Sequence, residues 1–335
     1  MIKNISMANV RETEEKGMQK RAAMEEPAGR AAEKTVTSRS IVIAGASGYL
    51  GRRLVERLIT PPQEKITDNN ILLLPRSTSR IADAVKGKTN VFIYNSDGEH
   101  LQERIQDFSP DVIYCAACCY ETIPEYLHKT VDANYAFPAR LLRIAAGIET
   151  KKVRFISIGT SLPPQLNLYS LTKKHFSELG EFFHQEGRIE FLNVLLESFY
   201  GECEPENRFI PRSILRLKAN QDVLLTEGRQ RRDYILIDDI IEILHFLLDC
   251  GETALLAEAG YTLPVGTGIA PSIRELIQFL RDEINSRSVL KFGAIKMRKN
   301  EPSTMADISL LRRIGFSKPL TYWKDGMKKV IRSFK

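Results

Sequence analysis

Residues 41–51 read IVIAGASGYLG, an apolar run that passes directly into a loop with three glycines. The run predicts a buried strand, and the apolar spacing over residues 50–58 predicts a helix after the loop. Gly45 permits a tight turn, Gly48 lets the backbone approach a pyrophosphate, and Gly51 lets the helix pack on the sheet. Phosphates would then lie at the helix N-terminus, where free N–H groups and the helix dipole favour anions.

This strand–loop–helix context predicts a site for a nicotinamide dinucleotide, with an ordinary glycine-rich turn as the alternative. The expected cofactor contacts are Gly45, Ser47, Gly48, Tyr49, Leu50 and Gly51. An acidic residue for an adenosine 2′-hydroxyl should follow the second strand, but residues 74–80 read LPRSTSR and hold no carboxylate. Arg76, with Ser77 beside it, is instead suited to a 2′-phosphate, so NADP(H) is favoured over NAD(H). The alternative is that these arginines are solvated surface charges.

Short apolar runs alternate with helical patterns along residues 39–200. Strands are expected at residues 41–44, 71–74, 91–94, 111–114, 153–158 and 192–196. The alternation predicts an α/β fold with a doubly wound parallel Rossmann sheet. The pattern loosens after Gly201, which predicts a smaller C-terminal α/β lobe that binds substrate. The expected division is an NADP-binding domain at 39–200, to which 230–250 return, and a lobe made from 201–229 and 251–335.

Composition narrows the class of protein. The chain has 335 residues, a net charge of +6 and 43% hydrophobic residues, enough for a sizeable core. No run of 18 apolar residues and no signal peptide are evident, so a cytoplasmic protein without a membrane span is expected. Residues 1–38 mix Lys, Arg and Glu and predict a charged extension, either flexible or a partner-binding arm.

Two kinds of ligand are disfavoured by the residues. No element combines basic and aromatic side chains in a row, so no nucleic-acid partner is expected. The thiols of Cys115, Cys118 and Cys119 fall close together, but a zinc site would need further ligands, so no metal is expected. Cys118 lies beyond the end of a predicted strand, where it can contact substrate.

Tyr169 and Lys173 stand four residues apart, and on a helix they share one face. A nearby ammonium favours the phenolate and lowers the pKa of a tyrosine. Tyr169 would then exchange a proton with a substrate oxygen while hydride moves to or from nicotinamide. The preceding strand ends at Thr160, the first choice for a hydroxyl that steadies this oxygen, and Ser161 is the second choice.

These segments, together with residues 111–117, Asn134 and the run RDYI at 232–235, resemble an extended short-chain dehydrogenase/reductase. Within that family, the chain resembles the nucleotide-sugar epimerase, dehydratase and 4-ketoreductase group, and most of all the CDP-abequose synthase-like reductases. The features behind this last likeness are GTSLP at 159–163, FYG at 199–201, and FGA at 292–294 followed by Arg298. The likeness covers about residues 40–333.

The resemblance implies roles for further residues. Ala116 and Ala117 would line the cofactor, Lys173 would bind the nicotinamide ribose, and Asn134 would support the active-site helix and its proton relay. A nucleotide-sugar substrate would meet Phe209 at its base and Arg232 and Arg298 at its diphosphate, since arginine can bind two oxygens at once. A homodimer through the Tyr169 helix is also implied, with packing inside one chain as the alternative use of its apolar residues.

Departures from the family limit these expectations. Only eight residues separate Thr160 from Tyr169, which predicts an open sugar pocket. Ser198 stands where many relatives have an asparagine that contacts the substrate phosphate. The 4,6-dehydratases follow the Thr160 position with Asp and Glu, whereas Ser161 and Leu162 stand here, so dehydration is disfavoured.

The expected activity is therefore NADP(H)-dependent reduction or epimerisation of a nucleotide-linked sugar, with 4-keto reduction favoured. The alternatives are a tailoring reductase of a non-sugar natural product and a non-catalytic dinucleotide-binding interaction protein.

Overall fold

The computed structural model describes residues 38–60, 69–77, 79–120, 124–251, 253–298 and 300–334. The expected N-terminal extension lies outside these residues except at its last position.

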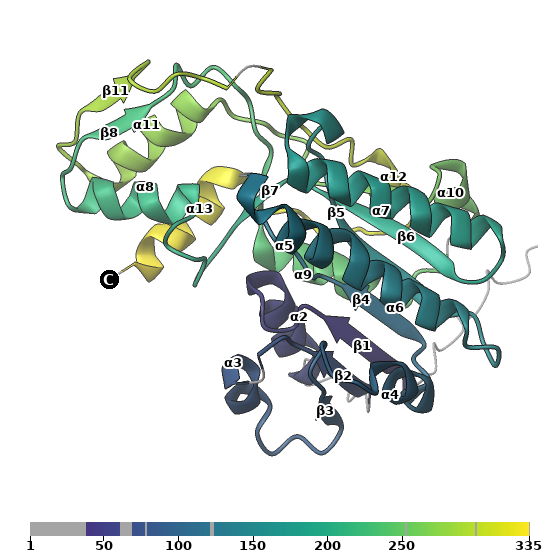
Figure 1. Ribbon diagram of the computed structural model, residues 1–335. Coiled ribbons are helices and arrows are strands. Elements are labelled where there is room, and N and C mark those ends of the chain that lie inside the picture. Colours follow the sequence, from purple (N-terminus) through teal and green to yellow (C-terminus); the bar gives the residue numbers. More distant parts are fainter. Residues whose placement is uncertain are drawn as a thin grey trace, which may run out of the picture. The chain divides into compact units, whose positions relative to one another are not determined.

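Seven parallel strands form the central sheet in the order β3-β2-β1-β4-β5-β6-β10 (Figure 1). The strands are β1 (Ser40–Ala44), β2 (Asn70–Leu74), β3 (Val91–Ile93), β4 (Val112–Cys115), β5 (Arg154–Thr160), β6 (Glu190–Leu196) and β10 (Thr262–Val265). The chain winds outward from β1 to β3, then crosses back to β4 and runs outward in the other direction. This confirms the doubly wound parallel α/β sheet, and the change of direction between β1 and β4 is where such sheets bind ligands.

Apolar side chains fill both faces of the sheet because successive residues of a strand point to opposite sides. In β1, Ile41 and Ile43 belong to one buried core, while Val42 and Ala44 belong to the other. The first core is completed by α2 (Tyr49–Ile59), α9 (Ile237–Phe246), α10 (Thr253–Glu258) and α12 (Ser309–Arg313). The second core is completed by α4 (Leu101–Phe108), α6 (Phe137–Ala146) and α7 (Leu168–Gln185).

The helical region between β4 and β5 is broken into pieces. Residues Leu127–Val131 form α5, Asp132–Ala136 form one π-helical turn, and α6 follows. The short helix α3 (Ser79–Ala82) follows β2. A π-helical turn inside a helix often marks a functional position.

A smaller lobe has its own apolar core. It contains α8 (Phe209–Lys218), β8 (Val223–Leu225), α11 (Ile273–Ile284), β11 (Leu290–Phe292) and α13 (Trp323–Ser333). Figure 1 shows α8, α11 and α13 gathered together beyond the end of the main sheet. Helix α11 begins at a capping box that the Ser272 side chain forms with Glu275. A two-stranded parallel sheet is formed by β7 (Ser198–Tyr200) and β9 (Tyr234–Leu236). It contributes side chains both to a core of the main sheet and to the core of the smaller lobe.

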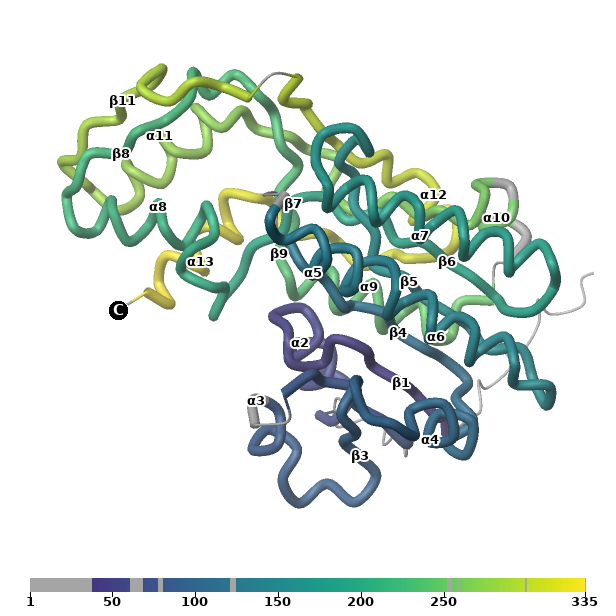
Figure 2. Tube along the Cα trace, viewed as in Figure 1, coloured from purple at the N-terminus to yellow at the C-terminus, as the bar shows by residue number. Residues whose placement is uncertain are grey.

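The division expected for residues 251–335 needs correction. β10 pairs with β6 in the main sheet, and α10 and α12 contribute Leu256 and Leu311 to one of its cores. Figure 2 shows the C-terminal part of the chain leaving the lobe, passing α12 beside the main sheet and returning to α13. Pro264 hides β10 in the sequence, since proline cannot donate to a ladder, but an edge strand tolerates it.

Candidate active site

The glycine loop lies against the end of β4, and two of its glycines are required there. Gly45 has φ of +79°, and a Cβ at this position would lie 2.6 Å from the Ala117 backbone nitrogen. A Cβ at Gly51 would overlap the carbonyl oxygen of Gly45, so only glycine lets α2 begin this close to the loop. The expected tight turn and close helix packing are therefore confirmed. The cradle of loop, helix N-terminus and β4 end fits a dinucleotide phosphate.

Arg76 follows β2 at the same edge of the sheet. Its guanidinium forms an ion pair with Asp132 on the π-helical turn, and half of the Arg76 side chain is exposed. Ser77 beside it is also exposed. The position therefore suits the adenosine end of a dinucleotide, but a 2′-phosphate would have to compete with Asp132 for the guanidinium.

Tyr169 lies in the first turn of α7, and a capping box fixes where that helix begins. The Asn167 side chain accepts a hydrogen bond from the Ser170 backbone at 2.9 Å, and the Ser170 hydroxyl accepts one from the Asn167 backbone. The Tyr169 hydroxyl lies within hydrogen-bonding reach of the Thr160 hydroxyl and the Cys118 thiol. The structure thus brings together three residues that the sequence predicted separately.

Burial raises the pKa of Tyr169 well above its ordinary value, and the nearby Cys118 thiol raises it further. The Thr160 hydroxyl and the Arg208 guanidinium act in the opposite direction. The Lys173 ammonium donates to the carbonyls of Ala117 at 3.0 Å and Ile158 at 2.9 Å. The expected lowering of the phenol pKa by Lys173 stays a prediction.

Asn134 is fully buried on the π-helical turn and joins three segments. Its side chain accepts a hydrogen bond from the Cys119 N–H and donates one to the Cys119 carbonyl, both at 2.9 Å. It also donates to the Thr172 hydroxyl on α7 at 3.2 Å. The amide thereby ties the β4 end, with Ala116 and Ala117, to the helix that carries Tyr169.

The residues expected to bind substrate lie in different surroundings, some of them buried or paired and others exposed. Ser161 lies within hydrogen-bonding reach of the buried Glu197, and Ser198 pairs with Tyr234 in the small β7–β9 sheet. Phe209 packs against the core of the lobe, and Arg298 is exposed. Cys118 is also exposed, next to Tyr169.

Arg232 does not present a free guanidinium. Its side chain is 8% exposed, forms an ion pair with Glu301 and donates to the Pro302 carbonyl. The next residue, Asp233, is fully buried and accepts from the Thr267 backbone and hydroxyl. The side chains of residues 232–233 therefore hold residue 267 and the segment 301–306 in place.

Two residues near Tyr169, Tyr120 and Arg208, had no role in the sequence analysis. The Tyr120 ring lies 4.8 Å from the Tyr169 ring, centroid to centroid. Arg208 precedes α8 and pairs with Glu204 at 3.0 Å. The four-residue spacing of Glu204 and Arg208 was a possible signal, but charged pairs at that spacing are common on surfaces.

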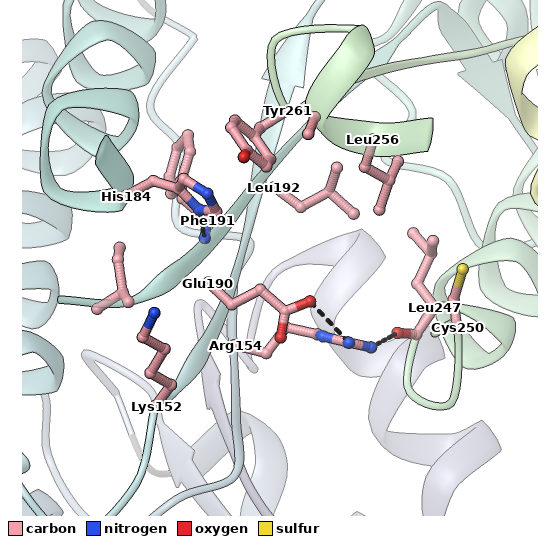
Figure 3. Close-up of a pocket in the computed structure, with 12 residues that line it drawn as sticks. Lys152, Arg154, His184, Glu190, Phe191, Leu192, Leu247, Cys250, Leu256 and Tyr261 are labelled. Atoms are coloured by element: carbon pink, nitrogen blue, oxygen red, sulfur yellow. Dashed lines mark hydrogen bonds and ion pairs between the residues drawn. The ribbon is translucent and has the colours of Figure 1, made fainter. Parts of the chain in front are cut away.

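A cavity of about 440 Å³ lies elsewhere, between β5, β6, α7 and α10 (Figure 3). Arg154 crosses it between Glu190 and the Leu247 carbonyl. Arg154 and Glu190 are the first residues of their strands, whereas Thr160 is the last residue of β5. The cavity is therefore at the opposite end of the sheet from Tyr169. Among the described residues, no group of His, Cys, Asp and Glu could hold a metal, and no helix could cross a membrane.

Fold and site together define an extended short-chain dehydrogenase/reductase, with the Tyr–Lys helix beside the glycine loop of a doubly wound sheet. More narrowly, the chain belongs to the NAD dependent epimerase/dehydratase family, whose model matches residues 41–255. It is therefore an enzyme of this class with a nicotinamide dinucleotide as cofactor.

Individual relatives agree with this assignment. The chain is 28% identical over 309 residues to the CDP-abequose synthase of Salmonella typhimurium, covering 87% of this chain and 97% of that protein. It is 32% identical over 206 residues to the CDP-abequose synthase of Salmonella muenchen, covering 59% and 68%. The solved UDP-glucuronic acid 4-epimerase of Bacillus cereus, in complex with UDP-glucuronic acid and NAD, matches with a TM-score of 0.75. Its identity is 21%, over 88% of this chain and 98% of that one.

Proposed function

We propose that the enzyme reduces the keto group of a nucleotide-linked 4-keto sugar. The observation that carries this proposal is the position of Tyr169 in the first turn of α7, with its hydroxyl within hydrogen-bonding reach of the Thr160 hydroxyl. A phenol in this position can donate a proton to a carbonyl oxygen. A hydroxyl at Thr160 beside it can hold the same oxygen.

In this reaction, each residue of the site has a separate role. A bound nicotinamide dinucleotide supplies the hydride. Tyr169 donates its proton to the substrate oxygen as negative charge develops there, and Thr160 donates a hydrogen bond to that oxygen. Lys173, held on the Ala117 and Ile158 carbonyls, fixes the distance between α7 and the ends of β4 and β5. Asn134 joins α7 to the segment that follows β4.

Dehydration has no support from the side chains at the β5 end. The residues after Thr160 are Ser161 and Leu162, and neither carries a carboxylate for the loss of water. The nearby Glu197 is buried and accepts from the Thr304 hydroxyl at 2.6 Å. Epimerisation is the second candidate function, because the solved structural relatives include a UDP-glucuronic acid 4-epimerase.

The substrate class rests on the relatives. Three of them are CDP-abequose synthases, so a CDP-linked keto sugar is the first substrate to test. We further propose NADP(H) as the preferred cofactor, since Arg76 stands where a carboxylate would select NAD(H).

Location and assembly belong to the same proposal. We place the enzyme in the cytoplasm as a homodimer through α7. In support, Leu171 and Phe182 on this helix are exposed, 37% and 55% respectively. Phe176, however, is used in the core of its own chain, as the alternative predicted.

A panel of CDP-, UDP- and ADP-linked 4-keto sugars tests the proposal. With NADPH, the expected result is stoichiometric loss of the reduced cofactor and a product that has gained two hydrogens. Conversion of a sugar without net cofactor oxidation would favour epimerisation. A structurally unrelated ketone as the one good substrate would favour the tailoring reductase.

A further inference from the structure

Arg208 and Glu204 form a charged pair on the chain that links β7 to α8. The Arg208 Nε lies 3.0 Å from Glu204 Oε1. The two side chains differ sharply in exposure, since 38% of Arg208 but only 2% of Glu204 is accessible. The carboxylate is therefore beneath and the guanidinium reaches the surface.

A second contact places the guanidinium against an aromatic ring. The Arg208 guanidinium carbon lies 4.5 Å from the centre of the Phe199 ring, a cation–π distance. Phe199 in turn stacks on Tyr49 of the glycine loop, with ring centres 6.2 Å apart and an angle of 16°. The Tyr49 hydroxyl donates to the Glu202 carbonyl at 3.0 Å. Arg208 is thus built onto the cofactor loop through two aromatic rings.

Arg208 also lies near the reacting groups. Burial raises the pKa of Tyr169, and the positive charge of Arg208 acts in the opposite direction. Its Nε is used by Glu204, and among the described residues no partner is recorded for its two terminal nitrogens. A guanidinium with both terminal nitrogens available can bind two oxygens of a phosphate.

The other candidate arginines are less suitable. Arg232 is nearly buried and is committed to Glu301 and the Pro302 carbonyl. Arg298 is exposed, and no side chain holds its guanidinium in place in the part of the chain described. Arg208 alone among the three combines an accessible guanidinium with a fixed orientation.

We propose that Arg208 receives the diphosphate of the substrate and that the buried carboxylate of Glu204 is its positioning residue. This inference rests on the proposed function, because it assumes a nucleotide-linked substrate. Glu204 Oε2 has no hydrogen-bond partner among the described residues, so packing does not explain why a carboxylate is buried here. In this proposal the carboxylate holds the guanidinium of Arg208 at the Phe199 ring, where the Arg208 side chain remains accessible.

The positioning should depend on pH. Burial raises the pKa of Glu204 to about 7, against the opposing effects of Arg208 and the Gly201 N–H. The other titratable groups coupled to this carboxyl are the phenols of Tyr49 and Tyr234, whose pKa values are raised and which stay neutral. Protonation of Glu204 below about pH 7 would weaken its hold on Arg208 and so weaken substrate binding.

Calorimetric titration with CDP-glucose and UDP-glucose tests the assignment, because their diphosphates do not titrate near neutral pH. Arg208→Gln should weaken both ligands by at least about tenfold, the loss expected for a charge-assisted contact. Arg212→Gln, an exposed arginine one turn further along α8, is the matched control and should bind as the wild type does. Binding of NADP+ should be unchanged in both variants.

A second pair of variants separates recognition from folding. Glu204→Gln should remove the pH dependence of CDP-glucose affinity around pH 7 while retaining a neutral acceptor for Arg208. The double variant Glu204→Gln/Arg208→Gln leaves no unpaired buried carboxylate and should still bind weakly.

Each of the following outcomes would overturn a specific part of the proposal. Unchanged affinity of Arg208→Gln for both sugar nucleotides, or a loss confined to NADP+, would overturn the role of Arg208. A wild-type affinity that does not change with pH would overturn the role of Glu204. If the wild type bound no sugar nucleotide, the proposed substrate class would fail and the assignment with it, a result distinct from equal binding by wild type and variant.

Discussion

The carboxyl group of Glu204 should make the stability of the enzyme depend on pH. Burial raises its pKa from 4.5 to about 7, so the folded protein holds this proton more firmly than the unfolded chain does. The resulting stabilisation is complete below pH 4.5 and is lost as the pH rises through about 7. A shift of roughly 2.5 pH units corresponds to a loss of about 3 kcal/mol in the free energy of unfolding at alkaline pH.

Glu204→Gln removes this titration and keeps a side chain of the same length. Between about pH 5 and pH 8, the free energy of unfolding of the wild type should fall by about 2.5 kcal/mol relative to the variant. Urea unfolding can follow the fluorescence of Trp323, the one tryptophan of the chain, which is buried in the lobe core. Glu206→Gln, at an exposed glutamate two residues away, is the control and should track the wild type.

Parallel stability curves for the wild type and Glu204→Gln would refute the reasoning, because they would mean that the carboxyl titrates at its ordinary pKa. A variant that is more stable at alkaline pH, but whose affinity for sugar nucleotide keeps the pH dependence of the wild type, would separate the two claims. It would support the energetic cost of the buried charge and contradict the role of Glu204 in binding.

Three further predictions concern the cofactor and the scaffold of the site. Asn134→Ala should lower the free energy of unfolding by about 1–3 kcal/mol, because it leaves the Cys119 N–H and carbonyl unpaired, and urea titration measures the loss. Arg76→Gln should raise the KM for NADPH and leave that for NADH unchanged, and equal effects on both would contradict the proposed 2′-phosphate contact. Gly45→Ala should abolish cofactor binding in a dialysis assay, since a Cβ would strike the backbone of Ala116 and Ala117 at positive φ.

The inner strands of the central sheet were predictable because they bury both faces. Runs such as residues 41–44 and 71–74 are continuously apolar, and the patterns between them have helical spacing. Tyr169 and Lys173 followed from a local rule as well, since four residues on a helix bring side chains to one face. Local periodicity was sufficient for these features, because each depends on residues that are close together in the sequence.

Other features depend on contacts between distant parts of the chain. The ion pair of Arg232 with Glu301 joins residues far apart in sequence, so no local pattern predicts it. The resemblance to the family had suggested that the Arg232 guanidinium would be free to bind a diphosphate. The pairing of Lys173 with the Ala117 and Ile158 carbonyls involves main-chain atoms that no sequence pattern reports. Residues 262–265 were assigned to the wrong unit because Pro264 masks an edge strand.

The break in the helix at residues 132–136 shows the same limit near the active site. Nothing in the run DANYA announces a π-helical turn, although Asn134 was correctly expected to support α7. The expected residue was found, but the backbone geometry that points its amide at Cys119 was not.

The most direct test of the proposed reduction is a single turnover of a CDP-linked 4-keto sugar with NADPH by the wild type and by Tyr169→Phe. The wild type should oxidise NADPH in a one-to-one ratio with sugar reduced. Tyr169→Phe should bind NADPH normally and react at least about a hundredfold more slowly, the loss expected when a general acid is removed. Undiminished reduction by Tyr169→Phe, or sugar conversion with no NADPH consumed, would contradict the assignment of Tyr169 as the proton donor of a ketoreductase.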